Sequence, residues 1–257
     1  AFLQRLAARA KERSAWAVDL RFPHDHFRKN QRAMAGQGYK TIVEGNNVLL
    51  EAATGSGKTL AVLFPAFKAQ ALDEQFFFLT SRNRGADAAI NAAKLIAADD
   101  VPLRVVQITA KEKTCPQTEM VCDAAVCPNA AGYYTRLSKA LTTLERCSIA
   151  DRQMIESIAA ENSLCPFELS LDSAMTADFV IGDYNYVFDP SVRLQRFAYQ
   201  TQRSLLIDDA HQLSNRVSDM LSIELRFSDV VAASDHAPSE ITESLAKLRV
   251  VMESLRD

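Results

Sequence analysis

The sequence has no run of 18 or more apolar residues, so nothing in it predicts a membrane-spanning helix. It also lacks internal repeats and low-complexity linkers. Cysteine is scarce, with five residues among 257, and the N-terminus lacks the apolar core of a secretory signal. An odd number of cysteines without such a signal argues against the disulfide framework of a secreted protein. Reduced thiols that lie close together more often indicate a metal site.

Neither positive nor negative charge is in large excess, since the net charge is −3. Its distribution is uneven, since residues 1–40 hold nine Lys or Arg and three Asp or Glu. The first 16 residues predict an amphipathic helix with Arg5, Arg9 and Arg13 away from its apolar face. Such a basic face could bind nucleic acid or simply be solvated. Helical patterns reach both ends of the sequence, and we expect the chain to be part of a longer protein.

Five short apolar runs alternate with segments of helical length. Each run is apolar on both faces, as expected for a buried parallel sheet, and the runs cover residues 47–52, 75–80, 103–108, 178–182 and 204–209. This alternation predicts a doubly wound α/β domain. The rhythm breaks between about 110 and 170, in the stretch that holds every cysteine, and we interpret this stretch as an insertion between two strands.

The strongest motif is "AATGSGKT", residues 52–59, between an apolar run and a helical pattern. It matches the phosphate-binding P-loop, with Ala52 in place of the first glycine. The loop residues Thr54, Gly55, Ser56 and Gly57 would surround phosphate oxygens, Lys58 would reach the β- and γ-phosphates, and Thr59 would hold Mg²⁺. A glycine-rich helix cap is the alternative. The absence of an N-K-x-D motif downstream favours ATP over GTP.

A second motif, "LLIDDAH", places two carboxylates at the end of an apolar run at residues 205–211. Ligands bind α/β sheets at the carboxyl ends of the strands. Asp208 fits the acid that holds Mg²⁺, Asp209 the group that orients the attacking water, and His211 a link to a neighbouring domain. An acidic cap for the next helix would explain the motif alone; its position after a P-loop favours the catalytic interpretation.

These two motifs, separated by the stretch that holds the cysteines, resemble the XPD/DinG-type iron–sulfur helicases of superfamily 2. "LRFPHDHFRKNQRAMA" resembles their adenine-side motif, which implies that Arg28 and Gln31 select adenine. "FFLTSRNRGADAA" resembles the motif that touches the DNA backbone through Thr80, Ser81 and Arg82. "ADFVIGDYNYVFDP" resembles the segment that leads to the acidic strand. The motifs of the second motor domain are not in this sequence.

The resemblance implies a RecA-like P-loop NTPase domain with a mainly helical iron–sulfur insertion. We expect an N-terminal segment at 1–44, the motor domain at 45–110 and 170–225, the insertion at 111–169, and the start of an Arch-like helical region at 226–257.

The cysteines Cys115, Cys122, Cys127 and Cys165 are the candidate metal ligands. Structural zinc sites prefer C-x2-4-C pairs, and only the interval from Cys122 to Cys127 has that spacing. A [4Fe–4S] cluster needs four thiolates without such fixed pairs. The spacing alone therefore leaves the cluster and zinc about equally favoured. The resemblance favours the iron–sulfur cluster. Cys147 lies in a helical pattern and is interpreted as a spare thiol. Four unligated cysteines are the remaining alternative.

The sequence is therefore interpreted as the first motor domain of an ATP-dependent DNA helicase, with ATP, Mg²⁺ and a [4Fe–4S] cluster as cofactors. The resemblance implies 5′→3′ movement on single-stranded DNA, binding to DNA junctions, a monomeric protein, and a location with the bacterial nucleoid or in the eukaryotic nucleus. Its partners would be the second motor domain and the Arch domain, with no membrane. The alternatives are a non-helicase P-loop ATPase with a zinc site and a non-hydrolysing nucleic-acid scaffold.

One departure from the helicase pattern is Asp209, where the familiar form has glutamate. The shorter side chain moves the carboxylate back by about 1 Å, and a misplacement of that size can cost about a hundredfold in rate. We therefore expect slow hydrolysis unless the backbone compensates.

Overall fold

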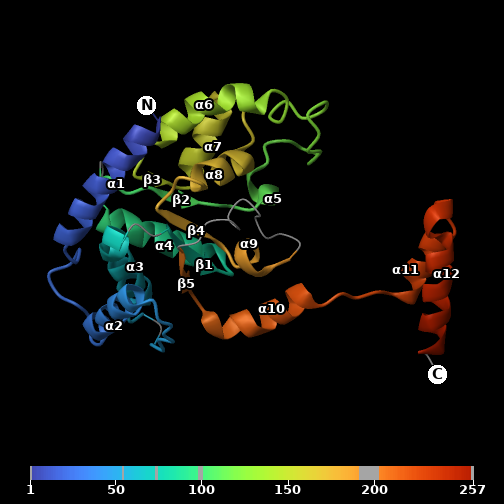
Figure 1. The fold of residues 1–257 in the computed structure, drawn as a ribbon, viewed down its shortest axis with the longest axis horizontal. Coiled ribbons are helices and arrows are strands. Elements are labelled where there is room, and N and C mark those ends of the chain that lie inside the picture. Colours follow the sequence, from blue (N-terminus) through green and yellow to red (C-terminus); the bar gives the residue numbers. More distant parts are fainter. Residues whose placement is uncertain (1, 54, 73–74, 98–100, 191–202, 256–257) are drawn as a thin grey trace. The chain divides into compact units, whose positions relative to one another are not determined.

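A computed structural model describes residues 2–53, 55–72, 75–97, 101–190 and 203–255. Its helices, drawn in Figure 1, begin and end as follows: α1 Phe2–Asp19, α2 Gln31–Glu44, α3 Lys58–Lys68, η1 Ala69–Leu72, α4 Asn83–Ile96, α5 Lys111–Thr114, α6 Tyr133–Leu144, α7 Arg152–Glu161, α8 Pro166–Ala174, α9 Asn185–Phe188, η3 Ala210–Gln212, α10 Leu213–Leu221, α11 Phe227–Ser234 and α12 Ser239–Ser254. None of the described helices has the length and apolar character needed to cross a membrane.

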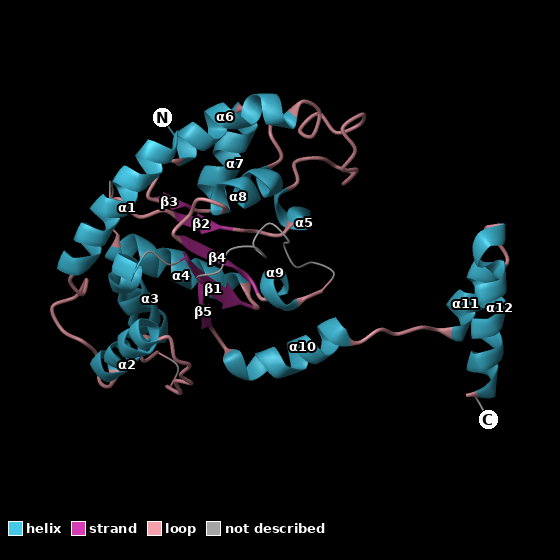
Figure 2. Cartoon of the chain, viewed as in Figure 1, coloured by secondary structure: helices cyan, strands magenta, loops and turns pink. Residues whose placement is uncertain are grey.

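The centre of the fold is a parallel sheet of five described strands in the order β3-β2-β4-β1-β5 (Figure 2). The strands are β1 Gln75–Thr80, β2 Val105–Gln107, β3 Ile149–Ala150, β4 Phe179–Asp183 and β5 Arg203–Ile207. Since all five strands are parallel, their carboxyl ends meet at one edge. This confirms the predicted α/β class and four of the five predicted strands.

Both faces of the central strands are buried, which explains why their sequences are apolar without alternation. Phe76 and Phe78 of β1 join a core cluster with residues of α3 and α4, while Phe77 and Leu79, which point to the other face of the strand, are also buried. On β4, the ring of Phe179 lies 4.9 Å from that of Phe67 in an edge-on arrangement. The burial predicted for the apolar run at 75–80 is confirmed.

The fifth predicted strand, at 47–52, is wrong. Residues 46–53 are described and form no strand, and Leu49 is 85% exposed. Within the described residues β5 pairs with β1 alone, so its other side offers an open edge. An apolar run has only a propensity for strand structure, and a neighbouring strand must pair with it for that propensity to be realised.

The stretch expected as an insertion contains α5 to α8, as its helical pattern predicts, and also the short strand β3, which the pattern does not predict. β3 pairs with β2 at the edge of the sheet, so part of the stretch completes the sheet. Contacts divide the described chain into two compact units, Ala1–Leu213 and Ser214–Asp257. In the second unit α11 packs on α12, and Val230 is buried there.

Candidate nucleotide site

The P-loop, residues 52–59, begins in the coil of residues 46–53 and ends in the first turn of α3. Gly55 and Gly57 have φ angles of +80° and +82°, a region that favours glycine. Lys58 begins α3, and its Nζ donates a hydrogen bond to the carbonyl oxygen of Ala52, at 2.9 Å. The hydroxyl oxygen of Ser56 is buried and has no hydrogen-bond partner among the described residues. This orphaned hydroxyl fits a loop that binds phosphate oxygens. Thr54 lies outside the described residues, and Thr59 is half-buried in the first turn of α3.

The adenine-side residues contact the same loop. Arg28 donates from Nη1 to the carbonyl oxygen of Gly55 at 2.8 Å, and Gln31 donates from Nε2 to that of Gly57 at 3.2 Å. The other amide atom of Gln31, Oε1, accepts the backbone N–H of Arg28 at 2.9 Å, and Gln31 is only 2% exposed. The structure therefore brings these two side chains to the P-loop. Their place beside it is compatible with the role that the resemblance implies.

The buried amide of Gln31 makes Gly57 the most restricted position of the loop. A Cβ atom added at Gly57 would lie 2.4 Å from Gln31 Nε2, whereas one added at Gly55 would meet no atom within 4 Å. Gly57→Ala should therefore weaken nucleotide binding by about tenfold or more, because backbone strain and a clash combine. Gly55→Ala is the matched control, since it adds the backbone strain alone. Titration with a fluorescent ATP analogue would measure both. Equal losses of nucleotide affinity in the two variants would show that the Gln31 amide does not restrict the residue at position 57.

The two carboxylates follow β5 at the carboxyl edge of the sheet. Burial and the neighbouring carboxylate of Asp209 raise the pKa of the Asp208 carboxyl, and the charges of Lys58 and His211 oppose this rise. Asp209 has a φ of +50°, in the left-handed region, and His211 lies exposed in η3.

The predicted nucleic-acid motif lies at the end of β1, beside the acidic turn. Thr80 is buried, and a Cβ atom on Gly85 would come within 2.1 Å of its hydroxyl oxygen, so this threonine packs inside the turn. Ser81 donates from Oγ to Oε1 of Gln212 at 3.1 Å. Arg82 is exposed and therefore the accessible member of the three. Gln212 is a contact that this motif alone does not identify, because it lies 131 residues from Ser81 along the chain.

The four candidate metal ligands lie along α5, the coil after it and the start of α8. Cys115 follows α5, Cys122 and Cys127 lie in the coil before α6, and Cys165 precedes α8. All five cysteines of the chain are free thiols. The described residues contain no group of three or more His, Cys, Asp or Glu that could hold a metal ion. The structure of the described residues therefore does not gather the predicted ligand set.

Lys111 contacts one of these thiols, that of Cys122. Its Nζ lies 3.6 Å from Cys122 Sγ and 3.5 Å from a carboxylate oxygen of Glu168. Burial lowers the pKa of Lys111, but Cys122, Glu168 and Cys165 outweigh it and the pKa is raised. Burial also raises the pKa of the Cys165 thiol. Lys111 is a contact that the cysteine spacing does not reveal.

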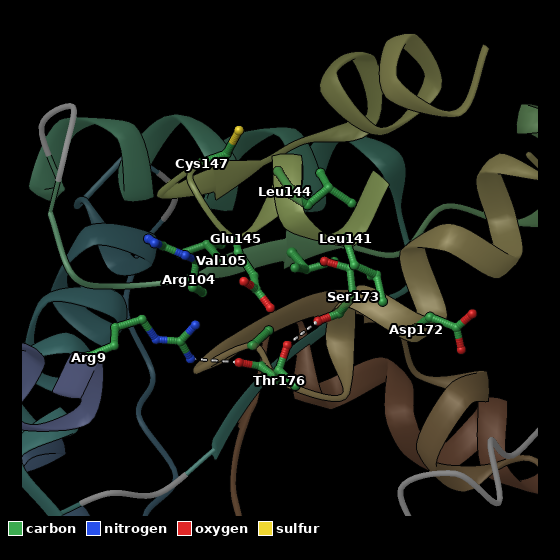
Figure 3. Close-up of a pocket in the computed structure, with 13 residues that line it drawn as sticks. Arg9, Arg104, Val105, Leu141, Leu144, Glu145, Cys147, Asp172, Ser173 and Thr176 are labelled. Carbon is green, nitrogen blue, oxygen red and sulfur yellow. Dashed lines mark hydrogen bonds between the residues drawn. The ribbon is translucent and has the colours of Figure 1, made fainter. Parts of the chain in front are cut away.

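The cavity drawn in Figure 3 is not part of this site, because it lies at the amino ends of the strands. It has a volume of about 50 Å³ and lies where α1, α6 and α8 meet β2. Arg9 donates from Nη2 to the carbonyl oxygen of Thr176 at 2.8 Å, and burial together with the charge of Arg9 lowers the pKa of Arg104. The negative charges of Asp178 and Glu145 oppose this lowering of the Arg104 pKa without reversing it. Charges of both signs therefore lie around the cavity. A space of this size and polarity suits a few water molecules.

The arginines of α1 thus contact protein rather than forming an open basic face. Arg13 and Arg9 both pair with the buried carboxylate of Asp178, and Arg5 lies 3.5 Å from Glu145. The helix predicted at the N-terminus is confirmed. The suggestion that this face binds nucleic acid is not favoured for Arg9 and Arg13, which are largely buried by these contacts.

A P-loop and an acidic strand end that meet at the carboxyl edge of a parallel sheet define the class of P-loop NTPase motor domains. Within that class, the family model DEAD_2 matches residues 89–230, more than half of the chain. The chain belongs to the DEAD_2 family. The resemblance to XPD/DinG-type helicases of superfamily 2 is confirmed.

Solved structures and curated proteins agree with this assignment. The structure titled "XPD_Helicase" aligns with 88% of this chain and 40% of its own, with a TM-score of 0.56 and 19% identity. "Truncated XPD" aligns with 84% of this chain and 63% of its own, with a TM-score of 0.53 and 18% identity. The regulator of telomere elongation helicase 1 homologs of Caenorhabditis briggsae and Caenorhabditis elegans are 32% and 30% identical over 41% of this chain. The matched part is 11% of the length of either relative.

Proposed function

We propose that this motor domain binds ATP with Mg²⁺ and couples its hydrolysis to 5′→3′ movement along single-stranded DNA and to duplex unwinding. The observation that carries the proposal is the geometry of the P-loop, in which Gly55 and Gly57 have φ angles of +80° and +82°, Lys58 begins α3, and the buried hydroxyl of Ser56 has no hydrogen-bond partner among the described residues. The hydrogen bonds of Arg28 and Gln31 place both side chains beside the P-loop, where the resemblance implies that they select adenine. A phosphate-binding loop, a carboxylate for the metal and an adenine-side contact are the parts that a helicase motor domain needs for ATP.

In this mechanism water attacks the γ-phosphate in line with the leaving group. Lys58 would stabilise the charge that develops on the phosphate oxygens, and Thr59 and Asp208 would hold Mg²⁺. Asp209 would orient the attacking water, and His211, which is exposed, would contact a neighbouring domain. Mg²⁺, when bound, would neutralise charge on the β- and γ-phosphates.

The nucleic-acid side of the proposal is supported by the strand-end motif and by the relatives. Arg82 and Arg84 are exposed at the start of α4, where two guanidinium groups could bind phosphates. The curated relatives are named as helicases that regulate telomere elongation. Single-stranded DNA and junctions are the proposed substrates, and a second motor domain and an Arch domain are the proposed partners of a monomeric protein.

The test is a comparison of ATP hydrolysis and strand separation by this chain alone and together with a second motor domain. We expect the chain alone to bind ATP weakly and to separate no strands, since half of the catalytic site is absent. With the second motor domain, hydrolysis should be stimulated by single-stranded DNA, and duplexes with a 5′ tail should be unwound in preference to those with a 3′ tail. Strand separation by the chain alone, or hydrolysis indifferent to DNA, would contradict the proposal.

We also propose that Cys115, Cys122, Cys127 and Cys165 hold a [4Fe–4S] cluster. Four free thiols supply the ligand type and number that such a cluster needs, and one of them, that of Cys122, contacts Lys111. Binding would have to bring the four thiols together. Such a rearrangement is expected where metal binding and local folding are coupled.

Anaerobic purification with assays of iron, sulfide and zinc tests the cluster. We expect a brown protein with about four irons and four sulfides per chain. Cys122→Ser should lose the iron, whereas Cys147→Ser is the matched control and should retain it. Stoichiometric zinc in a colourless protein would contradict the cluster, as would failure to bind iron after reconstitution.

A further inference from the structure

The backbone of Asp208 is held on both of its sides. Its N–H donates to the carbonyl oxygen of Leu79 on β1 at 2.9 Å, and its carbonyl oxygen accepts a hydrogen bond from the hydroxyl of Tyr184. Tyr184 follows β4 and is fully buried. Because β1 lies between β4 and β5, the tyrosine reaches across the end of β1 to the acidic turn.

This contact fixes the peptide plane between Asp208 and Asp209. The carbonyl of one residue and the N–H of the next belong to a single planar unit, so rotation of that unit would change ψ of Asp208 and φ of Asp209 together. Asp209 has a φ of +50°. A non-glycine residue pays about 1–2 kcal/mol for left-handed geometry, which persists only where the surroundings hold it. The Tyr184 hydroxyl is one of the groups that hold it here.

We propose that Tyr184 is a positioning residue for the Mg²⁺ site. Its hydroxyl holds the peptide between Asp208 and Asp209 and thereby directs the Asp208 carboxylate towards the metal of Mg·ATP. Tyr184 acts through Asp208 and has no role in the chemistry itself. The inference rests on the proposed function, because it takes Asp208 as the Mg²⁺ ligand.

Tyr186 provides a matched control two residues further on. It is also buried, and its ring lies 6.5 Å from that of Phe167. Its hydroxyl makes no hydrogen bond to any residue in the part of the chain that the structure describes, and burial, with the carboxylates of Asp183 and Glu112, raises its pKa to about 12. Tyr186→Phe therefore removes the same atom from a buried tyrosine without affecting Asp208.

The experiment is a titration with Mg²⁺ of the binding of a fluorescent ATP analogue to the full chain. Tyr184→Phe should raise the Mg²⁺ concentration at half-saturation by about fivefold, the effect of one hydrogen bond. Affinity for the analogue in EDTA should not change, and Tyr186→Phe should leave both quantities unchanged. A general structural role would weaken binding equally with and without Mg²⁺. That result, or an equal shift in the two variants, would overturn the inference.

Asp208→Asn separates this inference from the proposed function. We expect it to abolish the dependence of binding on Mg²⁺. If it does so while Tyr184→Phe has no effect, the inference about Tyr184 is wrong and the proposed function stands. If Asp208→Asn leaves the Mg²⁺ dependence intact, Asp208 is not the metal ligand, and both are overturned.

Discussion

Replacing Asp178 with alanine should lower the free energy of unfolding by about 3–5 kcal/mol, as expected when one partner of a buried ion pair is removed. Asp178 and Arg13 are each only 4% exposed and form an ion pair, and Arg9 lies 3.4 Å from the same carboxylate. The other carboxylate oxygen accepts the backbone N–H of Arg104 at 2.8 Å. The substitution would leave two guanidinium groups of α1 and one N–H of the sheet without this acceptor.

Urea denaturation of the full chain would measure the loss, and limited proteolysis would show whether α1 detaches first. Glu44→Ala is the control, because Glu44 forms an ion pair with Lys40 on the surface, where such pairs contribute about 0–1 kcal/mol. Replacing both charges, with Asp178→Leu and Arg13→Met, should recover much of the stability, since apolar residues of similar volume are often tolerated at buried ion pairs. A loss below about 1 kcal/mol for Asp178→Ala would contradict the anchoring role.

The same ion pairs show why the function of α1 could not be predicted from the sequence. Arginines at 5, 9 and 13 are spaced to lie along one side of a helix, and this spacing is the same whether the side faces solvent, nucleic acid or protein. The partner of Arg9 and Arg13 is Asp178, which is 165 residues from Arg13 along the chain. Only the folded chain shows that the pairing links the N-terminal helix to the start of β4.

The sheet and the nucleotide motifs were predictable because their signals are local. An apolar run such as Phe76–Phe78 indicates a buried strand by itself, and the P-loop glycines lie next to the lysine they serve. The run at 47–52 has the same local signal and forms no strand, because pairing with a neighbour decides the outcome. The hydroxyl of Tyr184 donates to the backbone carbonyl of Asp208. Every residue has such a carbonyl, so the residue types do not predict this contact. The cysteine spacing likewise gave ligand types but not their arrangement.

The backbone at Asp209 offers a physical reason for the departure from glutamate. Its φ of +50° lies in the left-handed region, where aspartate and asparagine are several-fold enriched among non-glycine residues. Their short polar side chains tolerate this geometry better than longer ones do. Compared with glutamate, aspartate at position 209 therefore has two opposing effects. It reaches less far towards the attacking water, but it adopts the left-handed backbone conformation at a lower energetic cost.

Asp209→Glu should raise the turnover of ATP in the protein completed by a second motor domain by about tenfold. Recovering about 1 Å of reach gains up to about a hundredfold, and a left-handed glutamate offsets part of this by about 1 kcal/mol. Steady-state hydrolysis with and without single-stranded DNA would measure the change, and a small fall in melting temperature should accompany it.

Asp209→Asn is the control, because asparagine tolerates the same backbone geometry and removes only the negative charge. It should abolish most of the turnover if Asp209 orients the water. If Asp209→Asn is inactive and Asp209→Glu is no faster than the unchanged protein, the backbone conformation rather than reach limits the rate. If Asp209→Asn keeps full turnover, the group that orients the water lies elsewhere, and the left-handed turn serves only to aim Asp208.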